Sequence, residues 1–413
     1  MASAKQRALI LGCHGGVGRA VLALLEHSVT GRRLRERLDG ILLADRQPLD
    51  SARLKDAVLL PPVTIASTQD LVRLVHLHRI TQFIDLSSID TVDCTRACDA
   101  RGVDFLCTSV EEWPEHGWLP TDEAIARLLP PRPLLSRRSH LIGSGANPGI
   151  VNALVFAALE AFGGRVGVQP TVAALDLHAV LITEEDTTFE TGETENGDVF
   201  PMTWSPLHCL EELFEPRAFA ARDGQVVSLG HRPTSQGYRA RCGEHVIIGM
   251  AVPHEEIATL ARRLPDVEIA FIYRIPPAAR RALKARPERQ TAAGWSFRRL
   301  YPPSTDAISG HDRVGVLLCS RRFGEFWMGF ETDVATGLAL GTNATQLQAG
   351  AGVVAGWTQL GRRTGIHFVE DLEWREFLDV VTDALGPTVS VHDPDAIPQS
   401  LAERREVMQV DDY

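Results

Sequence analysis

Arg7 to Gly18 read RALILGCHGGVG, an apolar segment that runs directly into a glycine-rich turn. Residues 19–26 continue with a helical pattern, so the order is strand, glycine turn and helix. The glycines are spaced Gly12-x-x-Gly15-x-x-Gly18, one residue longer than the GxGxxG of dinucleotide-binding folds. Such a turn presents backbone N–H groups at a helix N-terminus, where a pyrophosphate binds. The segment therefore predicts a nicotinamide-cofactor site, with a ligand-free glycine turn as the weaker alternative.

Each glycine of the turn has an expected role. Gly12 permits the tight turn after the strand, and Gly18 lets the helix pack closely. Gly15 or Gly16 lets the backbone approach the phosphates. The residues of the turn expected to bind the cofactor are Gly12, His14, Gly15, Gly16, Val17 and Gly18.

An acidic residue at the end of the second strand completes the fingerprint. Residues 40–44 are apolar and are followed by Asp45 and Arg46. Asp45 is expected to hold the ribose hydroxyls, which favours NAD, unless it is an ordinary strand-end turn residue. Arg46 is counted with the cofactor residues and keeps NADP open, because an arginine there can accept the additional phosphate.

The composition limits the class of protein. The 413 residues are enough for two domains, and the net charge of −11 argues against nucleic acid and permits a cationic substrate. No apolar run reaches the roughly twenty residues of a membrane span, and the first strand leaves no room for a signal peptide. Seven scattered cysteines without metal-ligand spacing indicate a reducing cytoplasm. We predict a cytoplasmic protein with no metal and no membrane partner.

Strand-like and helix-like segments alternate in the first part of the chain. Strands are expected at residues 8–11, 40–43, 63–66, 82–86, 103–107 and 140–143, with helices between most of them. This pattern predicts an α/β fold, a Rossmann-type doubly wound parallel sheet. Longer strands then follow, and they predict a second, α+β domain: 172–182, 226–229, 240–251, 268–275, 314–319 and 325–330.

We expect four consecutive parts. Residues 1–148 form the NAD-binding Rossmann domain, and residues 149–335 form the α+β domain for substrate binding and dimerisation. Residues 336–392 supply C-terminal helices that pack back on the first domain. Residues 393–413 are polar and charged and are expected to form a loosely held tail.

Ligands of doubly wound sheets bind beyond the carboxyl ends of the strands. Asn147 follows the sixth strand, where it can hydrogen-bond a cofactor amide or a substrate amine, or equally cap the next helix. The residues after the fourth, fifth and sixth strands that we expect at the cofactor are Leu86, Ser87, Thr108, Ala146, Asn147 and Pro148.

The second domain combines acidic residues with a tryptophan. Glu184 and Glu185 end an apolar strand, and Glu212 follows Trp204. Carboxylates and an indole suit an ammonium group, through Coulomb attraction and a cation–π contact. From the sequence alone, a solvated acid pair and a core tryptophan are the commoner outcomes. His254 follows another apolar strand and suits proton transfer near neutral pH, although a lone histidine is more often structural.

These segments together resemble bacterial homospermidine synthase, within the saccharopine-dehydrogenase-like group. The resemblance spans nearly the whole chain in order and fades between residues 257 and 312, where this chain is shorter and rich in arginine. It rests on the glycine turn and on GANPG at 145–149, EEDT at 184–187, TWS at 203–205, HE at 254–255, DRVGVLL at 312–318 and NATQLQ at 343–348.

The resemblance implies an NAD-dependent, redox-neutral reaction and a homodimer. A diamine such as putrescine is oxidised to an imine, a second amine replaces ammonia, and the same hydride reduces the new imine. The implied amine-binding acids are Glu111, Glu184, Glu212 and Asp312, with Glu185 competing for the position of Glu184. The implied catalytic residues are Trp204, which shields the iminium, Glu184, Asn147 and His254.

Two other functions remain open. One is a saccharopine-dehydrogenase-like reductive condensation of another amine or an amino acid with a carbonyl compound. A basic anchor should then line the pocket, and Arg239, Arg241 and Arg274 are candidates. The other is a non-catalytic NAD-binding sensor, which would not need the acids and Trp204 together.

Overall fold

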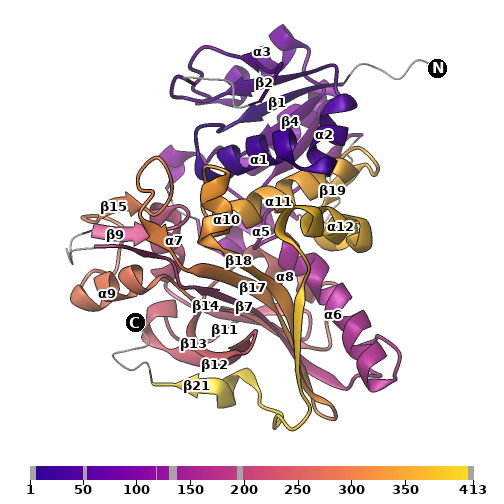
Figure 1. The fold of residues 1–413 in the computed structure, drawn as a ribbon, viewed down its shortest axis with the longest axis vertical. Helices are drawn as coiled ribbons and strands as arrows, with labels where there is room; N and C mark the ends of the chain where they lie inside the picture. The colour runs from indigo at the N-terminus through magenta and orange to yellow at the C-terminus, as the bar shows by residue number, and fades with distance from the viewer. Residues whose placement is uncertain (1–5, 50–53, 118, 130–136, 193–198, 408–413) are drawn as a thin grey trace.

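The computed structural model describes residues 6–49, 54–117, 119–129, 137–192 and 199–407, and the structural statements below concern these residues. They form two main sheets. Figure 1 shows the N-terminal sheet above the second one, with helix α11 (Ala344–Gln359) between them. The interface between the sheets therefore depends on a helix from the C-terminal part of the chain.

The first sheet has seven parallel strands in the order β19-β6-β5-β4-β1-β2-β3. Its strands are β1 (Arg7–Leu11), β2 (Gly40–Ala44), β3 (Val58–Leu59), β4 (Gln82–Asp85), β5 (Asp104–Cys107), β6 (Ser139–Leu141) and β19 (Gly365–His367). The helices between them are α1 (Gly16–His27), α2 (Val29–Glu36), α3 (Thr68–His78), α4 (Thr91–Arg101) and α5 (Thr121–Leu128). The predicted doubly wound α/β fold is confirmed. The strand order reverses between β1 and β4, which opens a crevice at that point.

The third strand lies earlier than expected. The predicted strand at 63–66 is wrong, because β3 covers Val58–Leu59 and Pro61 and Pro62 then interrupt the pairing. Only Val63 N still bonds to this sheet, donating to Asp45 O at 2.8 Å. Residues 63–66 instead continue past the carboxyl edge of β2.

The second sheet is mixed and has ten strands, eight of them in the order β20-β18-β17-β7-β14-β13-β12-β21. They are β7 (Leu177–Asp186), β10 (Phe219–Arg222), β11 (Gln225–Ser228), β12 (Gly237–Cys242), β13 (His245–Ala251), β14 (Glu268–Arg274), β17 (His311–Ser320), β18 (Gly324–Asp333), β20 (Val389–Asp393) and β21 (Arg405–Glu406). Its helices are α6 (Ile150–Val166), α7 (Pro206–Leu213), α8 (Glu255–Ala261) and α9 (Pro277–Ala285). The predicted α+β second domain is confirmed. The single strand expected at 240–251 is wrong, because Gly243 (φ +63°) turns the chain into the β12–β13 hairpin.

Two short two-stranded sheets flank the second sheet. Strand β9 (Val199–Met202) pairs with β15 (Ser296–Arg299), and β8 (Phe189–Glu190) pairs with β16 (Ile308–Ser309). Figure 1 shows β9 and β15 projecting beside α7. Strand β9 ends two residues before Trp204, so its pairing with β15 fixes where the Trp204 backbone lies.

The alanine- and glycine-rich helix α11 approaches its neighbours very closely. A Cβ at Gly350 would lie 2.6 Å from Cβ of Ala20 in α1, and a Cβ at Gly352 would lie 1.9 Å from Gly145 O. Side chains larger than hydrogen do not fit at these positions. Helices α10 (Val334–Ala339) and α12 (Trp374–Leu385) flank α11, and β19 returns the chain to the first sheet.

The C-terminal residues 393–407 are not a loose tail. Strand β20 pairs with β18, and β21 pairs with β12. Leu401 is fully buried, and the guanidinium of the buried Arg404 forms an ion pair with Glu325. The expectation failed because these few apolar and charged contacts are long-range and leave no periodic pattern in a polar sequence. Residues 408–413, the rest of the predicted tail, lie outside the described residues.

Both faces of the second sheet are covered by the chain itself. Val180 and Ile182 of β7 face the core shared with α6 and α11, whereas Ala179 and Leu181 face a core completed by β12 and Leu401. Within the described part, neither face of this sheet is therefore left for a second copy of the chain to cover. The homodimer stays a prediction that rests on the resemblance.

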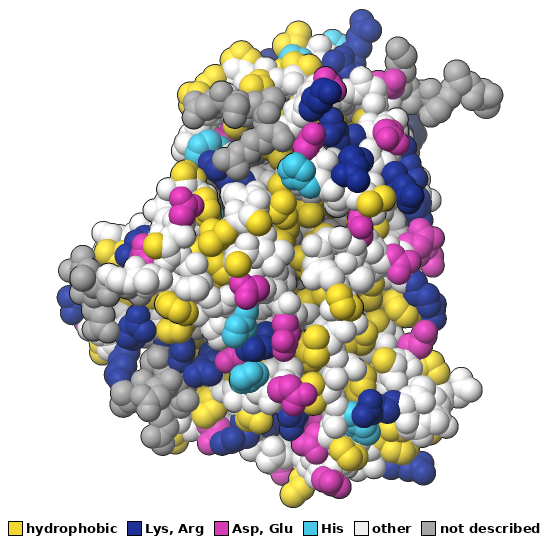
Figure 2. All heavy atoms as spheres, in the orientation of Figure 1, with side chains coloured by type: hydrophobic (Ala, Val, Ile, Leu, Met, Phe, Trp, Pro, Cys, Tyr) yellow, Lys and Arg dark blue, Asp and Glu magenta, His cyan; other side chains and the backbone are white. Residues whose placement is uncertain are grey.

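The surface carries charges of both signs. On the face in Figure 2, acidic and basic side chains are interspersed, and Lys and Arg gather over α2. That helix includes Arg32, Arg33 and Arg35. Among the described residues, none of the helices combines the length and apolar character needed to span a membrane.

Candidate active site

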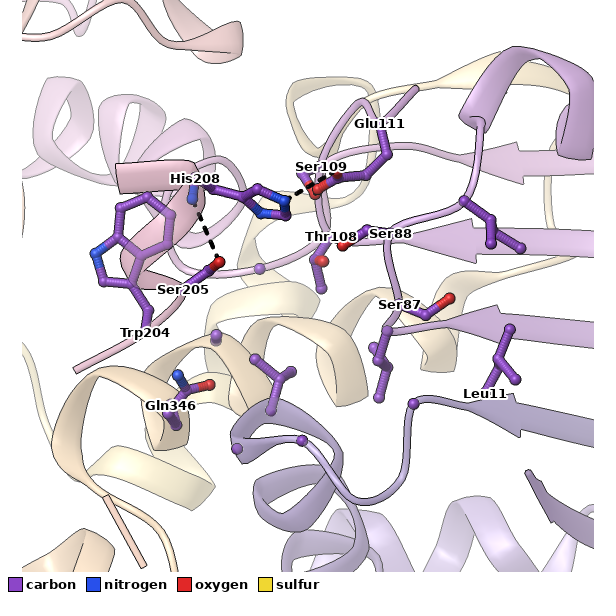
Figure 3. Close-up of a pocket in the computed structure, with 18 of the residues that line it drawn as sticks. Leu11, Ser87, Ser88, Thr108, Ser109, Glu111, Trp204, Ser205, His208 and Gln346 are labelled. Atoms are coloured by element: carbon purple, nitrogen blue, oxygen red, sulfur yellow. Dashed lines mark hydrogen bonds and ion pairs between the residues drawn. The ribbon is translucent and has the colours of Figure 1, made fainter. Parts of the chain in front are cut away.

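A cavity of about 610 Å³ lies where the carboxyl ends of the first sheet meet the second sheet. In its centre, Trp204 and His208 face Thr108, Ser109 and Glu111 (Figure 3). The predicted cofactor residues that line it are Gly12, His14, Gly15, Gly16, Val17, Asp45, Arg46, Leu86, Ser87, Thr108, Ala146, Asn147 and Pro148. The predicted substrate or catalytic residues that line it are Glu111, Asn147, Glu184, Trp204, Glu212 and His254.

The glycine turn is held by close backbone contacts. Gly12 has φ +86°, and a Cβ there would lie 2.4 Å from Leu86 O. A Cβ at Gly18 would lie 2.3 Å from Gly12 O, so Gly18 packs the helix on the turn and does not line the cavity. Gly15, the residue before α1, has only Gly12 O near its Cβ position, at 3.4 Å. Gly15 therefore presents an open backbone surface to the cavity at a helix N-terminus.

The predicted ribose-binding acid braces the same turn. Asp45 accepts hydrogen bonds from His14 N at 2.8 Å and from Gln47 N at 3.0 Å. Asp45 is buried and Arg46 is exposed, and both line the cavity. Asp45 therefore acts as a turn residue at the end of the strand, and it also lines the cavity where a cofactor ribose was predicted.

The loop after β4 is fixed by a carboxylate at the end of the strand. Asp85 accepts from Ser87 Oγ at 2.6 Å and from Ser87 N at 3.0 Å. Burial raises the pKa of Asp85 to about 7, although the bonds from Ser87 oppose the rise. Leu86 and Ser87 are thereby held against Gly12.

Asn147 does not cap helix α6. The amide of Gly149 instead donates to Asn152 Oδ1 at 2.9 Å. Asn147 Nδ2 donates to Glu184 Oε2 at 3.3 Å, and its buried Oδ1 has no protein partner among the described residues. The capping alternative is therefore wrong, because Asn152 takes the capping role and Asn147 bonds to Glu184.

Glu184 and Glu185, the two candidates for one acidic position of the resemblance, lie on opposite faces of β7, because side chains alternate along a strand. Glu184 lines the cavity, whereas Glu185 points to the opposite face, where Arg313 Nη1 lies 2.8 Å and Arg274 Nη1 lies 3.1 Å from its oxygens. Glu185 is thus removed from the predicted substrate site, because two arginines already neutralise it. The pKa of Glu184 is raised to about 7, mainly by burial. The hydrogen bond from Asn147 opposes this rise, and the charge of nearby Asp186 adds to it.

Asp312 is fully buried behind the cavity wall and does not line the cavity. It lies opposite Asp186 in the β17–β7 pairing, and its Oδ2 accepts from Thr345 Oγ1 at 2.6 Å. Burial raises the pKa of Asp312 well above its ordinary value, and Glu184 and Asp186 add to the rise. Thr345 therefore lies between Asp312 and the cavity, which Thr345 lines, and the predicted direct contact of Asp312 with substrate does not fit this position.

Trp204 lies at the cavity and not in the core. The indole is half-buried, and its Nε1 donates to Tyr273 Oη at 3.2 Å. Burial, together with the charges of Glu184 and Asp186, raises the pKa of Tyr273 well above its ordinary value. The phenol therefore stays neutral and holds the indole in one orientation.

Two acid–histidine groups complete the lining. Glu111 Oε1 accepts from Ser109 Oγ at 2.7 Å, and His208 Nε2 lies 3.8 Å from Glu111 Oε2. In Figure 3 the His208 ring reaches across the cavity toward Glu111. His208 and Glu212 are four residues apart in α7, so they share a face of the helix. Burial raises the pKa of Glu212 well above its ordinary value.

His254 is held in a carboxylate cage. Its Nδ1 lies 2.5 Å from Glu256 Oε2 and 3.4 Å from Glu255 Oε2. Burial disfavours the imidazolium, but Glu256, Glu255 and Glu212 outweigh burial and raise the pKa of His254 well above its ordinary value. Glu255 also accepts from Val110 N at 3.0 Å, which ties the second domain to the first.

Two clusters bring possible metal ligands together. One is the His254 cage, which hydrogen bonding already explains. The other joins Asp90, Glu112 and His116, where Arg127 forms ion pairs with both acids. In the His254 cluster, Glu256 Oε2 pairs with His254, while the buried Glu256 Oε1 has no hydrogen-bond partner among the described residues.

The chain is 26% identical over 441 residues to a homospermidine synthase of Blastochloris viridis, which covers 92% of this chain and 89% of that protein. The chain is similar to homospermidine synthase. The resemblance predicted from the sequence is thus confirmed, and no protein-family model matches the chain.

Two solved structures share the whole fold. The homospermidine synthase of Legionella pneumophila, crystallised in complex with NAD, superposes with a TM-score of 0.77 at 18% identity, covering 95% of this chain and 92% of that one. Saccharopine dehydrogenase (L-Glu forming) of Saccharomyces cerevisiae gives 0.53 at 10% identity, covering 94% and 100%. The saccharopine-dehydrogenase-like architecture is confirmed by both.

Three residues next to the predicted site residues were not predicted from the sequence: Asp186, His208 and Tyr273. Asp186 could have been found, because it is two residues after Glu184 in one strand and shares its face. His208 could have been found from its helical spacing to Glu212. Tyr273 gave no signal of its own, since only the pairing of β14 with β7 places it opposite Glu184.

Proposed function

We propose that this chain is an NAD-dependent enzyme of the homospermidine-synthase type. It would oxidise a diamine such as putrescine to an imine, exchange ammonia for a second amine, and reduce the new imine with the same hydride. The observation that carries the proposal is one cavity lined both by a glycine turn at a helix N-terminus and by Glu184, Glu212 and Trp204. A dinucleotide and a cationic amine would meet in that space.

The residues present fit NAD. Gly15 leaves room for phosphate at the N-terminus of α1, and Asp45 and Asn147 both line the cavity. Asp45 favours a ribose with free hydroxyls, which supports NAD over NADP. When bound, NAD would supply a hydride acceptor that becomes the donor for the closing reduction.

The charges of the cavity fit a diamine. Three acids line the cavity together with Trp204: Glu111, Glu184 and Glu212. Carboxylates at separate positions can select a saturated diamine by the distance between its two ammonium groups. Trp204 offers a π face to an iminium, a contact worth about 0.5–2 kcal/mol. The neutral Tyr273 fixes the indole for this role.

Glu184 would transfer the protons, while Asn147 and His254 favour its ionised form. Glu184 has a pKa near the operating range, so it can accept a proton from an ammonium group and return it to the departing amine. Asn147 stabilises its carboxylate form through the 3.3 Å hydrogen bond. His254 stays cationic and organises the neighbouring acids.

The condensation of a carboxylated amine is less well supported. Arg239 pairs with Glu406, Arg241 pairs with Asp393, and Arg274 pairs with Glu185. None of these three arginines lines the cavity. The three arginines that the sequence offered as anchors for a substrate carboxylate are therefore unavailable to this alternative. A cytoplasmic homodimer remains part of the proposal, through similarity alone.

The test is incubation of the purified protein with NAD and putrescine, followed by mass spectrometry for homospermidine and an ammonia assay. Product and equimolar ammonia without net NADH would support the proposal. If NAD binds by calorimetry and no product forms, the proposal is wrong, and amino acids with keto acids and NADH become the substrates to examine.

A further inference from the structure

Arg299 is a cation of the second domain on the wall of the cofactor cavity. Among the described lining residues, Arg46 and Arg299 are the two arginines, and none is lysine. Arg46 follows Asp45 at the end of β2. Arg299 is exposed at the end of β15, and its Cζ lies 5.8 Å from the centroid of the Tyr301 ring.

A chain of contacts holds the end of β15 close to the glycine turn. Leu300 N donates to Met202 O at 2.8 Å, and Asn343 Nδ2 donates to Leu300 O at 2.9 Å. Three residues on in α11, Gln346 Nε2 donates to Thr203 O at 2.9 Å. The Gln346 side chain also fills the space beside Gly16, where a Cβ would lie 2.7 Å from its Cδ.

Tyr301 places Arg299 near the start of α1. Burial raises the pKa of Tyr301, and the guanidinium groups of Arg299 and Arg19 oppose the rise. Arg19 belongs to the first turn of α1, so Tyr301 lies within electrostatic range of that helix as well as beside Arg299. Tyr301 and Arg299 line the same cavity as Gly15 and Gly16.

The glycine turn lacks a permanent cation of its own. Arg19 is buried, and its Nε donates to His14 O at 2.9 Å, so it braces the turn and does not line the cavity. A helix N-terminus offers about half an elementary charge, whereas a pyrophosphate carries two negative charges. We propose that Arg299 binds the cofactor pyrophosphate, so that the second domain supplies the cation that the glycine turn lacks. The inference rests on the proposed use of NAD.

The experiment is calorimetric titration of the protein with NAD and with ADP-ribose. Arg299→Gln is expected to lower the affinity for NAD and for ADP-ribose alike, by about tenfold or more, because both ligands carry the pyrophosphate. Arg299→Lys should lose less. Arg298→Gln is the matched control, because Arg298 is the neighbouring residue, pairs with Glu190 at 2.9 Å and does not line the cavity. Thermal unfolding checks that each variant is folded.

The outcomes separate the inference from the proposed function. Unchanged affinity of Arg299→Gln for both ligands would overturn the inference, even if the wild type makes homospermidine. A loss confined to a carboxylated amine would also overturn it and would make Arg299 a substrate anchor. Failure of the wild type to bind NAD would instead defeat the proposed function itself.

Discussion

Asn147 Nδ2 donates a hydrogen bond to Glu184 Oε2 at 3.3 Å, joining the loop after the first sheet to the end of β7 in the second. The bond favours the ionised form of a carboxyl whose pKa burial raises to about 7. One interaction therefore links the cofactor side of the cavity to the charge of the substrate side.

Glu184 should make amine binding depend on pH. An ammonium group binds the carboxylate form, so the diamine KM should fall as pH rises through about 7. Asn147→Ala removes a bond to the carboxylate and should move this transition to higher pH. KM measured across the range for both proteins checks this, and superimposable profiles would contradict it.

The same group should affect stability in the opposite direction. The unfolded carboxyl ionises near its ordinary value of 4.5, while the folded one holds its proton up to about 7. The folded state therefore binds the extra proton in this window, and the contribution of Glu184 to the free energy of unfolding falls as pH rises across it. Denaturant unfolding of the wild type and Glu184→Gln at several pH values measures the difference. A wild-type contribution that rises with pH would contradict the assignment.

Trp204→Ala should spare NAD binding and slow turnover by about tenfold or more, because the indole face that stabilises an iminium is lost. Trp204→Phe keeps a weaker π face, so its turnover should lie between those of the wild type and Trp204→Ala. Calorimetry and steady-state rates separate the effects. Turnover close to that of the wild type in Trp204→Ala would end its proposed role.

Glu212→Gln should raise the diamine KM by about tenfold, because a bound ammonium group favours the ionised form of Glu212 against the effect of burial on its pKa, and glutamine cannot supply that charge. Glu211→Gln is the control, since Glu211 is adjacent in α7 and does not line the cavity. Its KM should stay near the wild-type value. Equal effects of the two substitutions would move Glu212 out of the amine site.

Glu185→Gln should lower stability and leave amine binding intact. Arg274 and the buried Arg313 would each lose a carboxylate partner, at a cost of about 3–5 kcal/mol in the free energy of unfolding. Denaturant unfolding and diamine KM are the two measurements. A raised KM with unchanged stability would return Glu185 to the substrate site.

Gly15→Ala should affect NAD affinity, whereas Gly18→Ala should affect thermal stability. A methyl group at Gly15 projects into the cavity with only an ordinary contact to Gly12 O, so it should weaken NAD while leaving the thermal midpoint near that of the wild type. A methyl group at Gly18 would lie 2.3 Å from Gly12 O and should lower the midpoint. Loss of stability in Gly15→Ala without loss of NAD affinity would be the contrary result.

The sequence predicts the parts of this molecule that local chemistry governs. The glycine turn and the alternating apolar segments each carry their own signal, so the doubly wound sheet and its crevice could be inferred. Asn147 and Trp204 were ambiguous as single residues. The resemblance favoured a site role for both, and the structure places both at the cavity.

Long-range pairing accounts for what the sequence did not predict. Glu184 and Glu185 are adjacent acids, and only the arginines of β14 and β17 show which one is neutralised. Asp312 had an acidic position in the resemblance, but strand pairing buries it behind Thr345. Residues 393–407 look like a polar tail until their strands meet β18 and β12.

The redox-neutral cycle is tested most directly with putrescine deuterated on both carbons that bear nitrogen. The protein would be incubated with this substrate, NAD and an excess of unlabelled NADH, and the product analysed by mass spectrometry. The account predicts homospermidine that retains all of the deuterium, because the abstracted hydride returns to the same carbon within one cavity. Homospermidine that has lost deuterium to the NADH pool, or no homospermidine at all, would contradict it.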